Sequence, residues 1–168
     1  FEEDLDDGIT PDKWEKVIDP SRQYFSYTKT GLSSSVAHRG GRSLYYQVLR
    51  GNVAYETSGY LPIDPNRSYV FNGWIRSQCL RSSELFFQLQ LFAKEETGSL
   101  VEEVATPVTP VAVEASGWKK YSFTLGNIKP AVKFARIRCV LLGSDISGEC
   151  WFDDITLFEQ PRIIMDTH

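Results

Sequence analysis

Alternating apolar and polar residues run through the middle of the chain and predict β-strands. The clearest run is Tyr69–Gln78, which places Tyr69, Phe71, Gly73 and Ile75 on one face and Asn72, Trp74, Arg76 and Gln78 on the other. Similar strand-like runs are Ser43–Leu49, Val53–Leu61, Leu85–Lys94, Trp118–Leu125, Phe134–Leu142 and Gly148–Glu159, with a looser pattern in Gln23–Val36. Eight or so strands, no convincing helix and no repeat predict an all-β fold, an antiparallel β-sandwich.

Turn residues divide these strands and set the expected boundaries. Pro62–Asn66 contains two prolines and predicts a turn, and Ala37–Arg42 predicts a tight loop whose glycines expose carbonyl oxygens. Lys94–Gly117 predicts a long surface loop that holds a short strand near Val111. We expect residues 1–160 to form one domain and residues 161–168 to begin a linker to a neighbouring domain.

Composition narrows the class of partner. The chain of 168 residues has ten Phe, eight Tyr and four Trp, which favours a sheet protein. Its net charge of -4 argues against nucleic acid, which usually needs a basic face. No window approaches the roughly 18 consecutive apolar residues of a membrane span, so no such span is expected.

The cysteines predict no metal site. Cys79, Cys139 and Cys150 are odd in number and lack metal-type spacing, so at least one is unpaired within the chain. A bridge between Cys139 and Cys150 and two buried free thiols both remain open, with free thiols the preferred interpretation.

Two adjacent carboxylates, Asp153 and Asp154, stand in the middle of the last strand. Neighbouring strand residues point to opposite faces, so one of the two must point inward, where a carboxylate needs a cation or several donors. Asp153 shares its parity with Ile155 and Leu157 and is the preferred inward residue, with Asp154 as the alternative. We expect a bound calcium ion to meet this carboxylate, with a second ligand from the chain start at Glu2. The alternative is a carboxylate that only accepts hydrogen bonds from backbone N–H groups, without a metal.

No enzymatic constellation is found. His38 has no nucleophile motif beside it and is interpreted as a loop histidine. A glycosidase needs two carboxylates about 5–9.5 Å apart across a cleft. The outward-facing residues of the predicted strands include little acid beyond Glu84, and Asp153 and Asp154 are expected to face opposite ways. The chain is therefore expected to be non-catalytic.

An ordered set of short motifs resembles a known family. They are Phe1-Glu2, Trp14, Gly41-Arg42-Ser43-Leu44, Ile63-Asp64-Pro65 before Tyr69, and Gly117-Trp118 ahead of Trp151-Phe152-Asp153-Asp154-Ile155. Together they resemble the carbohydrate-binding modules found beside bacterial xylanases and glucanases, which are galactose-binding-like jelly rolls. The resemblance implies a secreted or cell-surface location, neighbouring domains, and a structural calcium ion held by Glu2, carbonyls around Gly41 to Ser43, and Asp153.

The resemblance also implies a sugar site on a concave sheet or its rim. Sugar rings stack on aromatic side chains, and their hydroxyls bind amides and charged donors. The outward-facing residues of three predicted strands would form one such face. Two of them are aromatic residues on which a sugar ring could stack, and six are polar: Trp74 and Phe86, with Asn72, Arg76, Gln88, Gln90, Arg136 and Arg138. The arginines make an acidic polysaccharide a possible ligand, and a structural or adhesive module that contacts protein is the alternative function.

Overall fold

The structure, a computed structural model, describes residues 13–17, 27–50, 52–78, 84–107, 117–142 and 148–161. These residues contain eleven strands and one short 3-10 turn, η1 (Thr97–Ser99). The strands are β1 (Trp14–Lys16), β2 (Tyr27–Ser33), β3 (Ser43–Arg50), β4 (Asn52–Thr57), β5 (Leu61–Pro62), β6 (Tyr69–Gln78), β7 (Glu84–Phe92), β8 (Leu100–Ala105), β9 (Lys119–Leu125), β10 (Phe134–Leu142) and β11 (Gly148–Glu159).

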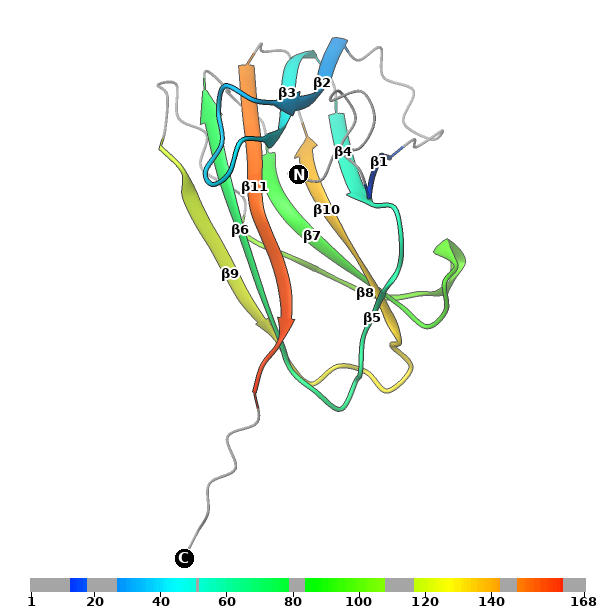
Figure 1. Cartoon of the computed structure of the whole chain (residues 1–168). Helices are drawn as coiled ribbons and strands as arrows, with labels where there is room; N and C mark the ends of the chain where they lie inside the picture. Colours follow the sequence, from blue (N-terminus) through cyan, green and yellow to red (C-terminus); the bar gives the residue numbers. More distant parts are fainter. Residues whose placement is uncertain are drawn as a thin grey trace, which may run out of the picture.

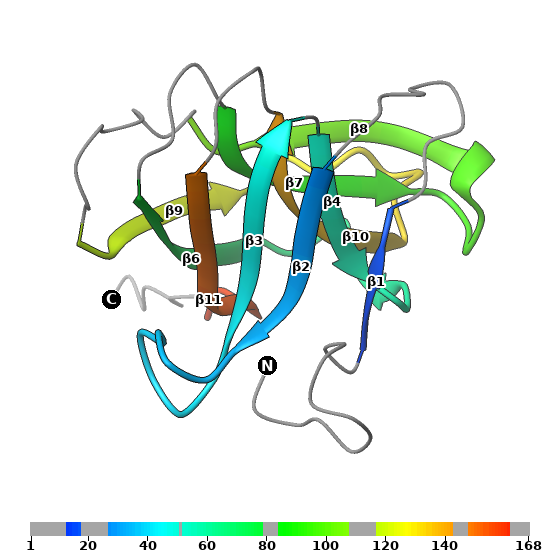
Figure 2. The ribbon, with the colours of Figure 1, turned by 90° about the horizontal axis from the view of Figure 1, so that it is seen from above.

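The strands form two sheets that face each other (Figures 1 and 2). A six-stranded sheet has the order β1-β4-β10-β7-β8, with β5 paired to β10, and a five-stranded sheet has the order β2-β3-β11-β6-β9. Every pairing is antiparallel. The predicted all-β antiparallel sandwich is confirmed.

The core lies between the two sheets and is built from the apolar face of each alternating strand. Phe87 of the six-stranded sheet packs edge-on against Phe71 and Phe152 of the five-stranded sheet, with ring centroids 5.2 and 5.5 Å apart. Gly73 makes room for this contact, because a Cβ at that position would stand 2.5 Å from the Cζ of Phe87. Trp14 packs against the same cluster from β1.

Two cysteines lie in this core as free thiols. Cys139 of β10 and Cys150 of β11 are both fully buried and unbridged. Burial raises the pKa of both thiols well above the usual value, so both are protonated at neutral pH. The preferred prediction of free thiols is confirmed for this pair, and Cys79 lies outside the described residues.

Two local expectations are corrected by the sheet pairing. The strand expected over 53–61 is interrupted, because β4 ends at Thr57 and a two-residue strand, β5, follows it. The long excursion after β7 holds the six-residue β8, which pairs with β7 and forms the edge of the six-stranded sheet. The short strand expected near Val111 lies outside the described residues.

Candidate functional site

The eight residues predicted to bind sugar lie on two opposite faces of the sandwich. β6 belongs to the five-stranded sheet, so Asn72, Trp74 and Arg76 lie on its outer face. β7 and β10 are neighbours in the six-stranded sheet, so the other five lie on that sheet's outer face: Phe86, Gln88, Gln90, Arg136 and Arg138. The expectation of a single shared face is wrong, because alternation gives the face of a residue within its strand but not the sheet to which the strand belongs.

A band of charged and amide side chains crosses the outer face of the six-stranded sheet. Strand register places Glu15 opposite Glu56, Glu56 opposite Arg138, and Arg138 opposite Gln88. One step along the strands, Arg136 is opposite Gln90, and Gln90 is opposite Glu103. We call these seven residues the polar band: Glu15, Glu56, Gln88, Gln90, Glu103, Arg136 and Arg138.

Ion pairs and hydrogen bonds connect the members of the polar band. Glu56 accepts from Arg136 at 3.1 Å and from Arg138 at 2.7 Å, and Arg136 also binds Glu15. Separately, Glu103 accepts from the amide of Gln90 at 2.9 Å and from that of Gln88 at 3.3 Å. Arg136 thus bridges the carboxylates of Glu15 and Glu56, which would otherwise repel each other across β1 and β4.

Exposure differs along the polar band and divides it into anchors and accessible groups. The side chains of Arg136 and Glu56 are only 6% and 9% exposed, whereas that of Arg138 is 25% exposed. Gln88 is half-buried and Glu103 is exposed. Arg136 and Glu56 therefore form a buried ion pair, and Arg138, Gln88 and Glu103 present polar atoms at the surface.

Tyr60 completes this face and was missed in the sequence analysis. It follows β4, and the guanidinium carbon of Arg136 lies 4.9 Å from its ring centroid. The ring also meets Phe92 and Phe134 edge-on, at centroid distances of 5.2 and 6.3 Å. Nothing in its local sequence signals this contact, since Tyr60 lies in the stretch that was interpreted as one continuous strand.

Asp153 is the buried carboxylate, as predicted, but it does not face the core. A β-bulge in β11 moves the register from Asp153 opposite Trp74 to Thr156 opposite Asn72. The extra residue is accommodated by Asp154, whose φ of 48° lies in the left-handed region. The bulge breaks the parity that grouped Asp153 with Leu157, so Asp153 lies on the outer face of the five-stranded sheet.

The loop over residues 36–42 covers Asp153 and satisfies its carboxylate. Its Oδ2 accepts from the backbone N–H groups of His38 at 2.8 Å and Arg39 at 3.2 Å, and its Oδ1 accepts from that of Asp154 at 2.8 Å. Desolvation nevertheless raises the pKa of Asp153, because three dipoles only partly replace water around the charge. The carboxylate thus ties the loop to the last strand.

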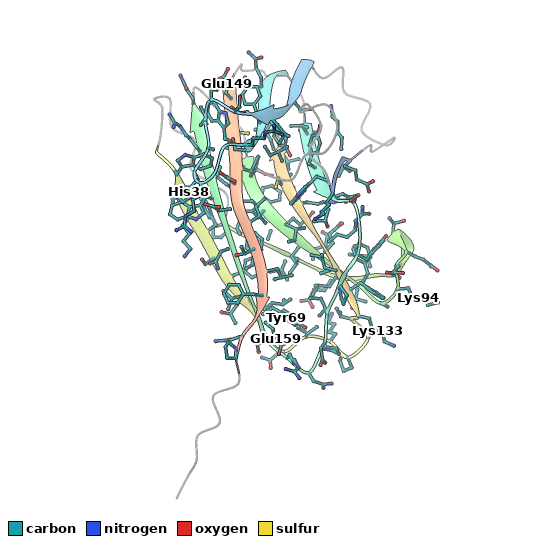
Figure 3. All side chains as sticks on the ribbon, viewed as in Figure 1. His38, Tyr69, Lys94, Lys133, Glu149 and Glu159 are labelled. Atoms are coloured by element: carbon teal, nitrogen blue, oxygen red, sulfur yellow. The ribbon has the colours of Figure 1, made fainter. Side chains whose placement is uncertain are left out.

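His38 is fixed on the same loop by three neighbours. Its Nδ1 lies 2.5 Å from Oδ2 of Asp154, its ring stacks on Trp74 at 3.9 Å, and Trp118 meets it edge-on at 5.6 Å. Figure 3 labels His38 beside β6 and β9. Its contacts are those of a loop anchor, in line with its interpretation as a loop histidine.

Among the described residues expected to hold calcium, Asp153 lines a pocket, whereas Gly41 and Ser43 are not among the residues that line it. Asp153, Gly40 and the bulge of β11 line this pocket of about 270 Å³, together with Trp14 and Arg39. Ser43 is buried, and its hydroxyl donates to the carbonyl of Val36 at 2.5 Å. Glu2 lies outside the described residues, and those described contain no cluster of three His, Cys, Asp or Glu side chains that would suit a metal.

The sandwich resembles several solved structures. A xylan-binding CBM22-1 domain from Paenibacillus barcinonensis is 13% identical with a TM-score of 0.56, covering 89% of this chain and 87% of that one. TmCBM61, solved in complex with β-1,4-galactotriose, is 17% identical with a TM-score of 0.53, covering 93% and 97%. The chain has the jelly-roll fold of carbohydrate-binding modules.

The same fold is also found inside larger proteins. The enzymatically active domain of tailspike protein 4 from bacteriophage CBA120 is 12% identical with a TM-score of 0.61, and the match covers 89% of this chain but only 20% of that one. No protein-family model and no curated protein matches the sequence. Among the described residues, no helix has the length and apolar character to cross a membrane.

Proposed function

We propose that this chain is a non-catalytic carbohydrate-binding module that binds polysaccharide at the polar band. The fold it shares with carbohydrate-binding modules supports sugar binding as the class of function. The side chains of the polar band support this face as the location of the binding site. Planar amides, guanidinium groups and carboxylates are the groups that bind sugar hydroxyls. Their ion pairs hold these groups in position on strands before a ligand arrives, which lowers the entropic cost of binding.

The charge balance of the polar band favours a neutral polysaccharide. Its three glutamates outnumber its two arginines, and both arginines already bind carboxylates. An acidic sugar would therefore meet net negative charge at this face, whereas neutral hydroxyls find both donors and acceptors. Tyr60, with its ring beside Arg136, supplies an aromatic surface at the margin.

Calorimetric titration with neutral β-linked polysaccharides tests this proposal. We expect the wild type to bind one of a panel of xylan, β-glucan and β-1,4-galactan. Gln88→Ala should weaken that binding by about tenfold, since a lost hydrogen bond in a ligand site costs on the order of 1 kcal/mol or more. Asn72→Ala is the matched control, because it removes an amide of similar exposure from the opposite face.

Two results would contradict the polar band as the ligand site. One is a wild type that binds no glycan in the panel, which would favour the structural or adhesive module that contacts protein. The other is loss of binding in Asn72→Ala with Gln88→Ala unaffected, which would move the site to the five-stranded sheet. We further propose that the module works outside the cytoplasm beside other domains, an inference that rests on the shared fold alone.

We also propose a structural calcium ion at the Asp153 corner, held by Asp153, Glu2 and carbonyl oxygens around Gly41 to Ser43. Oδ1 of Asp153 accepts one hydrogen bond and retains a lone pair. A cation would also favour the ionised carboxylate that desolvation disfavours. Oxygen donors of this kind suit calcium.

Removing divalent ions tests the calcium proposal by thermal unfolding. At calcium near 100 times its dissociation constant, binding adds about 2.7 kcal/mol to the free energy of unfolding. For a chain of this size that corresponds to roughly 5–10 °C in Tm. We expect a chelator to lower Tm by that amount and added calcium to restore it; an unchanged Tm would refute the metal.

A further inference from the structure

Arg76 is held on the outer face of the five-stranded sheet without a carboxylate partner among the described residues. Its guanidinium carbon lies 5.6 Å from the ring centroid of Trp151, its neighbour on β11. Its Nε is enclosed and has no hydrogen-bond partner. Trp151 is only 5% exposed, so a buried indole packs beside the guanidinium.

The other arginines for which the structure shows ion pairs differ from Arg76. Arg136 and Arg138 bind glutamates on the opposite face, Arg67 binds Asp64 and Glu159, and Arg39 lies 3.9 Å from Asp154. A half-buried guanidinium loses hydration, and an enclosed donor without an acceptor is rare in folded proteins. The terminal N–H groups of Arg76 also lack a carboxylate partner among the described residues, so an anionic ligand would find them available.

The surroundings of Arg76 favour an anionic ligand. Along β6 the next outward residue is Trp74, whose partner across β9 is the exposed Lys120. The acids nearby already have partners: Asp153 binds the amides of the covering loop, and Asp154 binds His38. The positive charges of Arg76 and Lys120 therefore have no described carboxylate partner.

A third acid, Glu149, is also engaged on this face. Its Oε1 accepts from the hydroxyl of Tyr45 at 2.9 Å, and that ring tilts against Trp151 at 5.7 Å. Burial and this hydrogen bond raise the pKa of Tyr45 to about 12, so the hydroxyl stays a donor to Glu149 at neutral pH. In Figure 3 Glu149 and His38 are labelled toward the same end of the sandwich.

We propose that this face carries a second binding site, for a sugar ring that bears an anionic group. Arg76 would bind the carboxylate of a uronate or a sulfate ester through its terminal N–H groups, which suit two-point contacts with planar carboxylates. Lys120 adds a second positive charge, and the half-buried rings of Trp74 and Trp118 offer apolar edges. This site lies on the opposite sheet from the polar band and does not depend on the function proposed for that band.

Binding of polygalacturonate to the whole chain, measured by calorimetry at low and moderate salt, tests this inference. Arg76→Gln should weaken binding by about tenfold or more, the range expected for a charge-assisted hydrogen bond. Arg76→Lys keeps the charge but loses the planar fork, so it should restore only part of the affinity. A sulfated polysaccharide in a parallel titration distinguishes the sulfate from the carboxylate as the preferred group.

Arg67→Gln is the matched control, since it removes the same charge from a residue whose carboxylate partners lie elsewhere. Equal loss in Arg67→Gln and Arg76→Gln would mean that only overall charge matters and would overturn the site. So would a wild type that binds neither anionic polysaccharide at low salt. Each variant is first compared with wild type by thermal unfolding, so that a folding defect is recognised as such.

Discussion

Replacing Asp153 with alanine should destabilise the fold more than replacing its neighbour Asp154. Asp153→Ala removes the acceptor of three backbone N–H groups, those of His38, Arg39 and Asp154. Each donor left without a partner costs about 1–3 kcal/mol when buried, and less where the loop admits water. Since Arg39 is exposed, we expect a total loss of about 3 kcal/mol.

Asp154→Ala removes much less. Its side chain is 29% exposed and its main contact is Nδ1 of His38. A partly exposed contact of this kind is worth up to about 1 kcal/mol. The left-handed φ of Asp154 adds a cost for alanine that asparagine avoids. Asp154→Asn therefore measures the loss of the charge with little added backbone strain.

Urea unfolding of these variants in chelator measures the comparison without a contribution from bound metal. We predict a free energy of unfolding about 2 kcal/mol lower for Asp153→Ala than for Asp154→Asn, or roughly 4–8 °C in Tm, and a smaller difference from Asp154→Ala because of its added backbone cost. If Asp154→Asn proves equally or more destabilising, then Asp153 does not tie the covering loop to the last strand.

Three other predictions test packing and charge. Glu56→Ala should cost about 3 kcal/mol, since it leaves the buried Arg136 and the partly exposed Arg138 short of an acceptor. Replacing the more exposed Glu15 with alanine should cost under about 1 kcal/mol in the same denaturation assay. Gly73→Ala should lose about 1–3 kcal/mol by a clash with Phe87, and Phe87→Leu in the same chain should recover part of it. The Tyr45 hydroxyl should titrate near pH 12 by ultraviolet absorbance, identified by its absence in Tyr45→Phe. Because the folded pKa of Tyr45 is raised, its contribution to stability is complete below pH 10 and is lost as pH rises through 12.

The longer strands were predictable because each carries its own signal, whereas the short β1 and β5 and the edge strand β8 were not predicted. The burial of β6 alternates through all ten residues as its sequence indicates, and the inward face of β10 is the apolar row Ala135, Ile137, Cys139 and Leu141. What alternation does not encode is which strands become neighbours. The pairing of strands depends on contacts between segments that are distant in the sequence. This pairing places Trp74 and Gln88 on opposite sides of the molecule.

The arrangement of the site residues was less predictable than the strands, because it depends on one backbone conformation and on tertiary contacts. The bulge in β11 depends on one residue adopting a left-handed backbone, and Asp154 tolerates that conformation without requiring it. The importance of Tyr60 comes from a tertiary contact with Arg136. A tyrosine after an interrupted strand gives no local sign of that contact.

Backbone amide NMR during titration with a neutral β-1,4-linked oligosaccharide shows directly whether the polar band binds neutral polysaccharide. We predict shift changes concentrated on β4, β7 and β10 around Glu56, Gln88 and Arg138, with β6 and β9 unchanged. Shift changes centred on Trp74 and Lys120, or none at saturating oligosaccharide, would contradict it.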